Sequence, residues 1–388
     1  MTDLMKTDLT LGEQSRALYR YPPKSQHKSL QAWDSADELL IQYVTEHPLD
    51  FNTGITILND DFGALTCFLH SQVRHWYSDS QVAHLALSHN LTKNGLDASH
   101  MTVHKDLQTL NGQLPVLMKL PKSNEFLTEI LIHLRQSLPD GALVVAGAKT
   151  TAIHTSTLKL FEQHLGKTTT SLAQKKSRLI LARVNKGLTS KSHYPVIWPV
   201  PDSSVHLVNF ANVFANQQLD IGARFLLQHM PHCKDKRVVD LGCGNGVLGV
   251  SCLHNAVQMG TPKSLHFVDE SYMAIQSAKA SVELLINSQP TNNQPEIYYH
   301  HSNCLENADT GSVDVILCNP PFHQQQTITD HIAWQMFVEA KESLQKGGEL
   351  RIVGNRHLDY HQKLKRLFGG YSMVASNKKF VILSSKKR

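Results

Sequence analysis

The run Asp240-Leu-Gly-Cys-Gly-Asn-Gly246 ends an apolar segment and opens a helical pattern. Glycines at such a junction let the backbone turn sharply and leave room for a ligand against the strand end. A dinucleotide fingerprint would need glycine at Val247, and a P-loop would need Gly-Lys-Ser/Thr, which the run lacks. An acid followed by alternate glycines is the spacing associated with S-adenosylmethionine, a ligand without phosphate. The loop is therefore predicted to hold the methionine portion of that cofactor.

Two further polar positions follow the next two apolar strands. Asp269 stands 23 residues after Gly246, where the second strand of a βαβ unit ends, and a carboxylate there can accept both ribose hydroxyls. The third strand ends in His301-Ser302-Asn303-Cys304, where an acid or amide would meet the adenine amine. Solvated acids are common at strand ends, but the glycine loop upstream favours the ligand-binding role for Asp269.

The most specific feature is Asn319-Pro320-Pro321-Phe322, which follows the fourth apolar strand. The two prolines fix the backbone and lack N–H donors, so carbonyl oxygens and the Asn319 amide oxygen are left to accept. Two acceptors that converge on an amine would turn its lone pair toward a sulfonium methyl group, and attack then needs mainly alignment. Phe322 offers a flat apolar face for a base turned out of its helix. The turn therefore predicts methyl transfer to an amine.

Strands and helices alternate around these motifs. Apolar runs and helical periodicity predict strands over 237–241, 264–268, 296–300, 313–318 and 349–353, helices over 247–259, 272–287 and 330–345, and a closing hairpin over 371–384. Such alternation is typical of a parallel sheet covered by helices, with ligands at the carboxyl ends of the strands. The C-terminal half is therefore predicted to be a doubly wound α/β domain that carries all three motifs on successive strand tips.

The N-terminal half contains a faint copy of the same order. V-L-M-K-L-P-K and P-D-G-A-L-V-V-A-G-A-K run in parallel with V-I-L-C-N-P-P and K-G-G-E-L-R-I-V-G-N-R. The matching order of apolar runs, glycines and prolines predicts an α/β protein of two tandem, pseudo-equivalent Rossmann-like domains that arose by duplication. Chance likeness stays an alternative, because strand, helix and glycine recur in any such fold.

The N-terminal copy is predicted to be degenerate. When Gly63 is aligned with Gly246, Asn59 and Asp61 take the places of two loop glycines, and Lys119-Leu120-Pro121 replaces the Asn-Pro-Pro turn. Side chains at these positions occupy the space that a ligand needs next to bare backbone. This half is therefore expected to keep the fold without the catalysis.

Length and proline content predict the domain boundaries. The chain has 388 residues, which suits two domains that each bury a core. The segment Y-P-V-I-W-P-V-P over 194–201 carries three prolines in seven residues and cannot lie inside a helix or a central strand. We predict an N-terminal domain over 1–195, a linker and lead-in over 196–211, and a catalytic domain over 212–388.

Composition bounds the cellular setting. The first residues lack a basic start followed by an apolar segment, and no apolar run reaches the roughly 20 residues that span a bilayer. The six cysteines show no paired spacing, and the 23 histidines form no H-E-x-x-H cluster. We expect a cytoplasmic monomer with reduced thiols, without a metal ion and without membrane contact.

Positive charge is unevenly distributed. Between residues 141 and 201 nine Lys and Arg accompany one acid, and between 363 and 388 eight accompany none, although the net charge is only +5. Such runs are more often solvated faces than binding sites unless another feature points to a polyanion. A base turned out of RNA is such a feature, so the N-terminal domain is predicted to bind phosphates. The residues predicted for this role are Lys119, Lys122, Lys175, Lys176, Arg178, Arg183 and Lys186.

The sequence resembles the Asn-Pro-Pro-[Phe/Tyr] branch of class I methyltransferases, and within it the ribosomal guanine-N2 methyltransferases. N-P-P-F-H and G-G-E-L-R-I-V-x-N are similar to both the small-subunit methyltransferase C family and the large-subunit methyltransferase G family. D-H-I-A-W-Q-M-F, N-R-H-L-D-Y-H-Q-K-L-K and the lead-in N-V-F-A-N-Q-Q-L-D-I-G-A-R-F-L-L over 212–227 are similar to the large-subunit family. The full length and the duplicated layout match that family too.

The resemblance implies methylation, with S-adenosylmethionine, of N2 of a guanine in 23S rRNA. It assigns Asp240, Gly242, Cys243 and Gly244 to the methionine end of the cofactor, Asp269 to its ribose, Asn303 and Cys304 to its adenine, and Asn319 to Phe322 to the target base, with Asn319 also next to the cofactor. Relatives in the wider superfamily often have Asp where Asn303 stands. A 16S rRNA guanine-N2 methyltransferase and a non-catalytic RNA-binding assembly factor remain alternatives. A protein-glutamine or DNA-adenine methyltransferase would more often carry Tyr where Phe322 stands.

Overall fold

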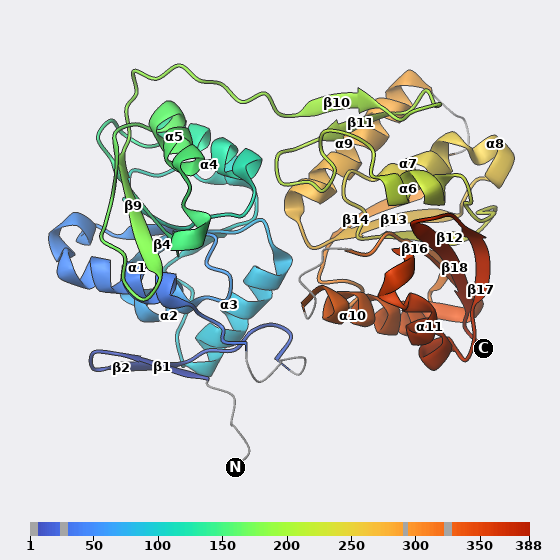
Figure 1. Ribbon diagram of the computed structural model, residues 1–388, viewed down its shortest axis with the longest axis horizontal. Coiled ribbons are helices and arrows are strands. Elements are labelled where there is room, and N and C mark those ends of the chain that lie inside the picture. The colour runs from blue at the N-terminus through green and yellow to red at the C-terminus, as the bar shows by residue number, and fades with distance from the viewer. Residues whose placement is uncertain (1–6, 24–29, 290–293, 322–327) are drawn as a thin grey trace, which may run out of the picture. The chain divides into compact units, whose positions relative to one another are not determined.

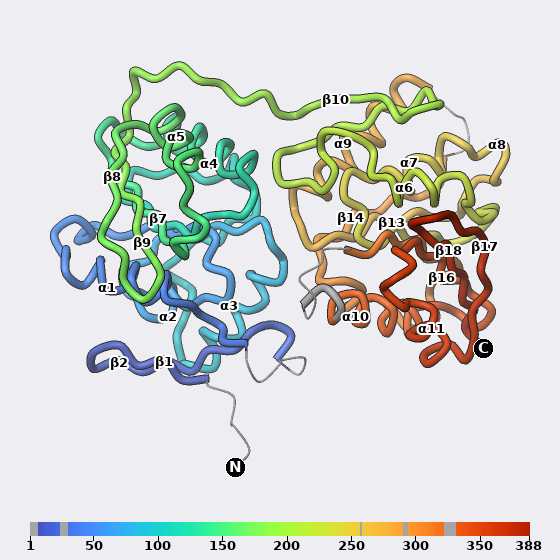
Figure 2. Tube along the Cα trace, in the orientation of Figure 1, coloured from blue at the N-terminus to red at the C-terminus, as the bar shows by residue number. Residues whose placement is uncertain are grey.

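A computed structural model describes residues 7–23, 30–289, 294–321 and 328–388 (Figure 1). The chain divides into two compact units, Met1–His193 and Tyr194–Arg388. Residues 184–195, which lead from the last strand of the first sheet to the second unit, form neither helix nor strand (Figure 2). Each unit is built on its own seven-stranded sheet.

The C-terminal unit is a doubly wound α/β sheet. Its strands are β10 Val196–Pro199, β11 His206–Asn209, β12 Arg237–Leu241, β13 Ser264–Asp269, β14 Glu296–His301, β15 Val313–Cys318, β16 Leu344–Asn355, β17 Ser372–Ser376 and β18 Phe380–Lys386. Its helices are α6 Ile221–Leu227, α7 Val247–His254, α8 Ala256–Met259, α9 Tyr272–Ser288, α10 Ile328–Ser343 and α11 Tyr360–Phe368. The sheet order is β14-β13-β12-β15-β16-β18-β17, and β18 alone runs antiparallel to the other described strands of this sheet.

Two apolar clusters cover the two faces of this sheet. Neighbouring strand residues point to opposite faces, so Val238 joins the cluster beneath α6, α7 and α9, while Val239 joins the cluster beneath α10 and α11. Because helices cover both faces, the central strands are mostly apolar, with charged residues near their ends. This arrangement leaves the carboxyl ends of the strands as the edge where polar side chains gather.

Most of the expected elements of this half are found, with two differences. The helix expected over 247–259 is interrupted at Asn255, a residue whose side chain competes for backbone hydrogen bonds. The helix expected to reach residue 345 ends at Ser343, because the buried Leu344 pairs with Val313 and starts a longer strand. Tertiary strand pairing here overrides helical periodicity.

The segment expected to be a linker, 196–211, forms a small ribbon. Strands β10 and β11 pair antiparallel, with Val196 opposite Asn209. A two-stranded ribbon has only edge strands, which tolerate proline. The backbone N–H groups of Val208 and Phe210 donate to hydroxyl groups on α9, so the end of this segment is attached to the C-terminal unit.

The N-terminal unit repeats the same sheet. Its strands are β1 Asp8–Leu11, β2 Gln14–Ala17, β3 Ile55–Leu58, β4 Val73–Tyr77, β5 Thr102–His104, β6 Val116–Lys119, β7 Leu143–Lys149, β8 Thr168–Thr170 and β9 Ser177–Arg183. Its helices are α1 Ser35–Glu46, α2 Ala64–Phe68, α3 Gln81–Lys93, α4 Asn124–Ser137 and α5 Thr155–His164. The order β5-β4-β3-β6-β7-β9-β8 matches the second sheet strand for strand. The predicted pair of tandem α/β domains is confirmed.

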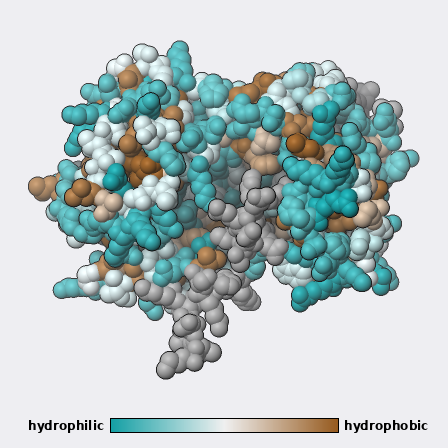
Figure 3. All heavy atoms as spheres, in the orientation of Figure 1, coloured by the Kyte–Doolittle hydropathy of each residue, from teal (hydrophilic) through white to brown (hydrophobic). Residues whose placement is uncertain are grey.

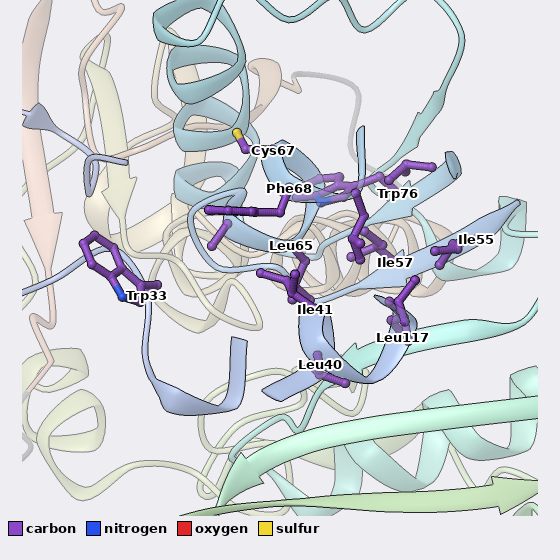
Figure 4. Packing of buried hydrophobic residues seen from close by; sticks show 14 of the residues in the cluster. Trp33, Leu40, Ile41, Ile55, Ile57, Leu65, Cys67, Phe68, Trp76 and Leu117 are labelled. Carbon is purple, nitrogen blue, oxygen red and sulfur yellow. The ribbon is translucent and has the colours of Figure 1, made fainter. Parts of the chain in front are cut away.

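The N-terminal core is dominated by large apolar side chains. Figure 4 shows Trp76 and Phe68 beside Ile57, with Leu40 and Leu117 in the same cluster. Trp76 and Leu40 are fully buried. A residue of this size contributes about 1.5–3 kcal/mol when buried, so this half has a hydrophobic core of its own.

Candidate active site

The glycine loop after β12 is tied to the end of β13. The N–H groups of Gly242 and Cys243 donate to the Val268 carbonyl at 2.8 and 3.0 Å, and the N–H of Gly244 donates to Oδ2 of Asp269 at 2.9 Å. Gly242 and Gly244 adopt φ of +69° and +55°, which side chains rarely allow. The structure thus brings the loop and the strand-end acid, predicted separately, into direct contact.

Two glycines of this loop serve different purposes. Among the described residues, a Cβ atom on Gly244 would meet only the Phe214 carbonyl oxygen, at 4.0 Å, so this glycine borders open space. A Cβ atom on Gly246 would lie 3.0 Å from Ala278 on α9. Gly244 therefore leaves backbone accessible to a ligand, whereas Gly246 permits the close packing of α7 against α9.

Asp240 is fully buried at the end of β12. Its Oδ2 accepts the N–H of Gly249 at 2.9 Å, while Oδ1 is buried without a partner among the described residues. Burial raises the pKa of this carboxyl group to about 8, with a further contribution from Asp269. An unpaired buried carboxyl oxygen beside the glycine loop suits the polar end of an amino acid, such as the methionine portion of S-adenosylmethionine.

Replacing Asp240 by Asn should flatten the pH dependence of stability. The folded-state pKa, about 8, lies above the ordinary value of 3.8, so between these pH values the folded chain binds a proton that the unfolded chain has lost. The stability contribution of Asp240 is therefore present at low pH and is lost as pH rises through this window. Urea unfolding of the cofactor-free protein at several pH values should show a free energy that falls more steeply in wild type than in Asp240→Asn, by up to about 1 kcal/mol per pH unit. Parallel curves would contradict a protonated Asp240.

Asp269 ends β13 with both carboxylate oxygens engaged. Oδ1 accepts the N–H of Ser271 and Oδ2 accepts that of Gly244, each at 2.9 Å. Burial raises the pKa of this carboxyl group. Each carboxylate oxygen can accept a second hydrogen bond, so Asp269 is fixed in place while it keeps the capacity to accept ribose hydroxyls.

The residues predicted to meet adenine lie beside Asp269. The N–H of Ser302 donates to the Asp269 carbonyl oxygen at 2.9 Å, which brings the end of β14 against the end of β13. Asn303 is 6% exposed, and its Nδ2 donates to Oε2 of Glu306 at 3.2 Å. Cys304 adopts φ of +49°, and burial raises the pKa of its thiol. The turn is thus rigid, and its thiol is neutral.

Asn319 follows β15 at the same edge of the sheet. Its Nδ2 donates to Oδ2 of Asp220 at 3.2 Å, and its Oδ1 is buried without a partner among the described residues. Pro320 and Pro321 lie directly after it, while the predicted stacking residue Phe322 falls outside the described residues. The amide is therefore oriented with its donor side occupied and its acceptor side available.

Asp220 is a residue that the sequence reasoning missed. It is the N-cap of α6, where its Oδ2 accepts the N–H of Ala223 at 2.9 Å as well as the Asn319 amide. An aspartate immediately before a helix is an ordinary capping residue, so a local pattern could have indicated the cap but not its second partner. The partner is 99 residues away in the chain.

The N-terminal unit has a lysine at the equivalent place. In the two sheets Leu58 pairs with Met118 as Leu241 pairs with Cys318, so Lys119 corresponds to Asn319. Nζ of Lys119 lies 2.7 Å from Asp34 and 2.8 Å from Asp37. Asp34 caps α1 as Asp220 caps α6. An internal ion pair thus occupies the position that corresponds to the acceptor site of the other unit.

The prediction that Lys119 binds RNA is wrong. Its side chain is 11% exposed, and these two carboxylates neutralise its charge. A buried, paired ammonium group is not available to phosphate. The sequence alignment matched Lys119 with Asn319, as the structure does, but it did not reveal the carboxylates that pair with Lys119.

The other predicted RNA-binding residues differ in exposure. Lys122, Lys176, Arg183 and Lys186 are exposed. Lys175 is exposed as well, with its Nζ 2.5 Å from Glu38. Arg178 is half-buried, and its Nε atom is buried without a partner in the described part of the chain.

Two classes of site find no support in the described residues. No cluster of three or more His, Cys, Asp or Glu side chains is placed to hold a metal ion. No helix in the described ranges is both long and apolar enough to cross a bilayer.

The arrangement at the carboxyl edge defines the class of protein. The glycine loop after β12, which lacks phosphate-binding features, lies against Asp269 at the end of β13. The amide of Asn319, with its oxygen available as an acceptor, directly follows β15. This is the site of an S-adenosylmethionine-dependent methyltransferase of class I. Family profiles agree, since the methyltransferase small domain matches residues 204–384 and the RLMG N-terminal domain matches residues 6–186.

Relatives of known name narrow the class further. The ribosomal RNA large subunit methyltransferase G of Pseudoalteromonas atlantica is 49% identical over 392 residues, which cover 99% of this chain and 100% of that one. The protein of the same name from Aeromonas hydrophila is 46% identical over 389 residues, with coverage of 99% and 100%. The chain belongs to the family of ribosomal RNA large subunit methyltransferase G, as its sequence resemblance indicated.

A solved structure shares the whole architecture. The 16S rRNA N2 G1207 methyltransferase of T. thermophilus, in complex with AdoMet and guanosine, aligns with a TM-score of 0.72 over 98% of both chains, at 17% sequence identity. At this identity the likeness shows a common fold.

Proposed function

We propose that this protein transfers the methyl group of S-adenosylmethionine to N2 of a guanine in 23S rRNA. The observation that carries the proposal is the Asn319 amide, whose Nδ2 is held by Asp220 while Oδ1 is left as a buried acceptor. Relatives that match over the full length are named for the large ribosomal subunit. The N2 position is supported by the AdoMet and guanosine complex of a protein with the same fold.

In this proposal Asn319 and the adjacent backbone carbonyl accept the two N–H groups of guanine N2. The nitrogen lone pair then points toward the methyl carbon, and Pro320 and Pro321 keep the turn free of competing N–H donors. S-adenosylmethionine supplies an activated methyl group, so the reaction requires alignment more than proton transfer. A bond forms from N2 to the methyl carbon, the carbon–sulfur bond breaks with its electron pair on sulfur, and one N2 proton leaves to water. Phe322 is proposed to stack on the base.

The cofactor fits the residues at the first three strand ends. Gly244 borders open space, Asp240 has an unpaired carboxyl oxygen, and Asp269 can accept further hydrogen bonds. Gly242 and Cys243 shape the loop, with Asn303 and Cys304 proposed at the adenine. These roles place the methionine, ribose and adenine portions along one edge of the sheet.

Mapping of methylated guanines tests the proposal. Purified protein is incubated with S-adenosylmethionine and with protein-free 23S or 16S rRNA from cells that lack the gene, and digests are analysed by mass spectrometry. We expect one N2-methylguanosine, in 23S rRNA. Methylation confined to 16S rRNA would move the target to the small subunit. Absence of methylation of either RNA, naked or in ribosomal particles, would favour a non-catalytic assembly factor.

Replacing Asp269 by Ala should weaken cofactor binding. The change removes the acceptor proposed for the ribose and leaves the Gly244 N–H without its partner, a loss of about 1–3 kcal/mol, or roughly 5- to 150-fold in affinity. Isothermal titration with S-adenosylhomocysteine measures the effect. Unchanged affinity, with an unaltered fold by circular dichroism, would exclude Asp269 from the ribose site.

The N-terminal unit is proposed to bind RNA through its exposed cations, which are Lys122, Lys175, Lys176, Arg183 and Lys186, with Arg178 beside them. Replacing Lys176 and Arg183 together by Ala should lower the slope of log affinity against log salt by about 1.5 in magnitude, at roughly 0.7–0.9 per phosphate contact. The matched control replaces the exposed Lys93 and Lys105 of the same unit by Ala and should keep the parental slope. Equal slopes in all three proteins would indicate a merely solvated surface.

The same proposal accounts for location and assembly. An rRNA substrate places the reaction in the bacterial cytoplasm. All proposed catalytic and cofactor residues come from one chain, so a monomer suffices.

A further inference from the structure

A second basic surface lies on the C-terminal unit, apart from the site described above. A depression of about 690 Å³ is lined by His361, Gln362, Lys365, Arg366, Gly370 and Tyr371. Two of these side chains carry a positive charge, and none carries a negative charge. The proposed reaction makes no use of any of them.

Helix α11 presents these cations because it is strongly amphipathic. Tyr360, Leu364 and Phe368 are buried at spacings of four residues, which leaves Lys365 and Arg366 exposed on the opposite side. The helix, Y-H-Q-K-L-K-R-L-F, contains no acid. Figure 3 shows hydrophilic side chains over the surface where α11 lies in Figure 1.

The charges around this depression are unbalanced. Arg388 adds a further cation at its rim, where its Nη2 donates to the Gly369 carbonyl at 3.3 Å. Lys341 donates to the Leu367 carbonyl at 2.6 Å from the neighbouring helix α10. Among the side chains that the structure describes, the acid with a contact on α11 is Asp359, whose Oδ1 lies 3.9 Å from Nδ1 of His361 with its side chain 62% exposed. One solvated carboxylate does not neutralise this group of cations.

Aromatic rings accompany the cations. The Arg366 guanidinium lies 5.3 Å from the centroid of the Trp334 ring, which holds the charge in place. Tyr371 is 39% exposed, and its ring centroid is 5.8 Å from that of His361. Cations that contact phosphates beside an exposed ring that stacks on a base are the combination that binds single-stranded nucleic acid.

The position of α11 relates this surface to the active site. Strand β16 ends at Asn355 on the carboxyl edge of the sheet, and α11 begins five residues later and runs back along the sheet. The surface therefore starts with His361, near the edge that carries Asn319. Its cations Lys365 and Arg366 in the last turn of α11, and Arg388 after β18, lie toward the amino edge of the same sheet.

We propose that the α11 surface, made by His361, Lys365, Arg366, Tyr371 and Arg388, binds the phosphate backbone and one unpaired base of the RNA strand that carries the target guanine. This inference rests on the proposed rRNA substrate. It adds a binding site within the catalytic unit to the cations proposed on the N-terminal unit.

A pair of matched double variants tests the surface. Lys365→Ala with Arg366→Ala removes two charges from it, and Lys234→Ala with Lys263→Ala removes two exposed charges from the amino edge of the same sheet. We expect the first pair alone to lower the slope of log affinity against log salt for protein-free 23S rRNA by about 1.5 in magnitude. The first pair should also raise KM for RNA while kcat and affinity for S-adenosylhomocysteine stay unchanged.

Tyr371→Ala provides an uncharged test of base stacking. It should weaken RNA binding by roughly 5- to 100-fold, as loss of one stacked base does, without changing the salt slope. Parental binding by both Tyr371→Ala and the first double variant would overturn the proposal, as would equal loss in the two double variants. Weakened binding to assembled particles alone, with normal binding to naked rRNA, would assign the surface to a protein partner instead.

Binding and methylation are measured separately, so the two proposals fail separately. A wild-type protein that binds rRNA but methylates no guanine would contradict the proposed reaction, while the salt slopes would still decide the α11 surface. A protein that methylates 23S rRNA and shows parental behaviour in both α11 variants would contradict the surface alone.

Discussion

Asn319→Ala should reduce kcat for rRNA methylation by at least about 100-fold while affinity for S-adenosylhomocysteine stays within about twofold. The side chain supplies the buried Oδ1 acceptor that is proposed to hold guanine N2 in line with the methyl group. Loss of alignment at a reacting atom costs about two orders of magnitude in rate, whereas the cofactor contacts proposed at Asp240 and Asp269 are untouched. Single-turnover methylation and titration calorimetry on the same preparation separate the two effects.

The fold should survive this change. Asn319 donates one hydrogen bond to Asp220, and a bond of this kind contributes about 0.5–1.5 kcal/mol. Thermal unfolding that shifts by only a few degrees would therefore be expected. Near-normal turnover by Asn319→Ala would move the active site away from β15 and would remove the main support for the proposed reaction.

Asp220→Ser should lower kcat by roughly 10- to 100-fold with little change in stability. Serine is as good an N-cap as aspartate, so α6 keeps its first hydrogen bond, but the shorter side chain does not reach Nδ2 of Asn319. Without that partner the amide can rotate and present its NH₂ group to the guanine amine, which disfavours the productive geometry. Asp220 thus acts through Asn319 as a positioning residue.

Two further variants distinguish positioning from stability. Asp220→Ala removes both the cap and the Asn319 contact, so it should lose the same activity and, in addition, about 0.5–2 kcal/mol of stability. Asp34→Ser is the matched control, because Asp34 caps α1 and contacts Lys119 in the N-terminal unit. It should reduce stability and leave kcat unchanged. An Asp220→Ser enzyme with parental kcat would show that Asn319 needs no orienting partner.

The duplicated architecture explains why one half is proposed to be catalytic. In both units a capping aspartate contacts a residue at the carboxyl end of a central strand. Asp220 contacts Asn319 directly after β15, and Asp34 contacts Lys119 at the end of β6. An amide leaves an acceptor for a substrate, whereas an ammonium group is consumed by its two carboxylates. Lys119 in place of Asn319, together with Asp37 in place of Ala223, thus separates an internal ion pair from an open acceptor site.

The sequence by itself determined the strands of the C-terminal sheet and the residues at their tips. Apolar runs bounded by glycine, proline and polar residues predicted β12, β13 and β15 because central strands buried on both faces must be mostly apolar. Asp269 and Asn319 could be predicted as ligand-facing candidates for the same reason, since a polar residue at the end of such an apolar run lies at the edge of the sheet.

Only the tertiary structure decided which residues become partners. Asp220 was not predicted to belong to the site, and its contact with Asn319 joins positions 99 residues apart. Lys119 was predicted to be a cation that binds RNA, but it is buried and forms ion pairs with Asp34, the N-cap of α1, and with Asp37 on that helix. The end of α10 was set by the pairing of Leu344 with Val313. Local sequence encodes burial and backbone preference, but hydrogen bonds and ion pairs between distant segments depend on how the chain packs, so no local pattern revealed them.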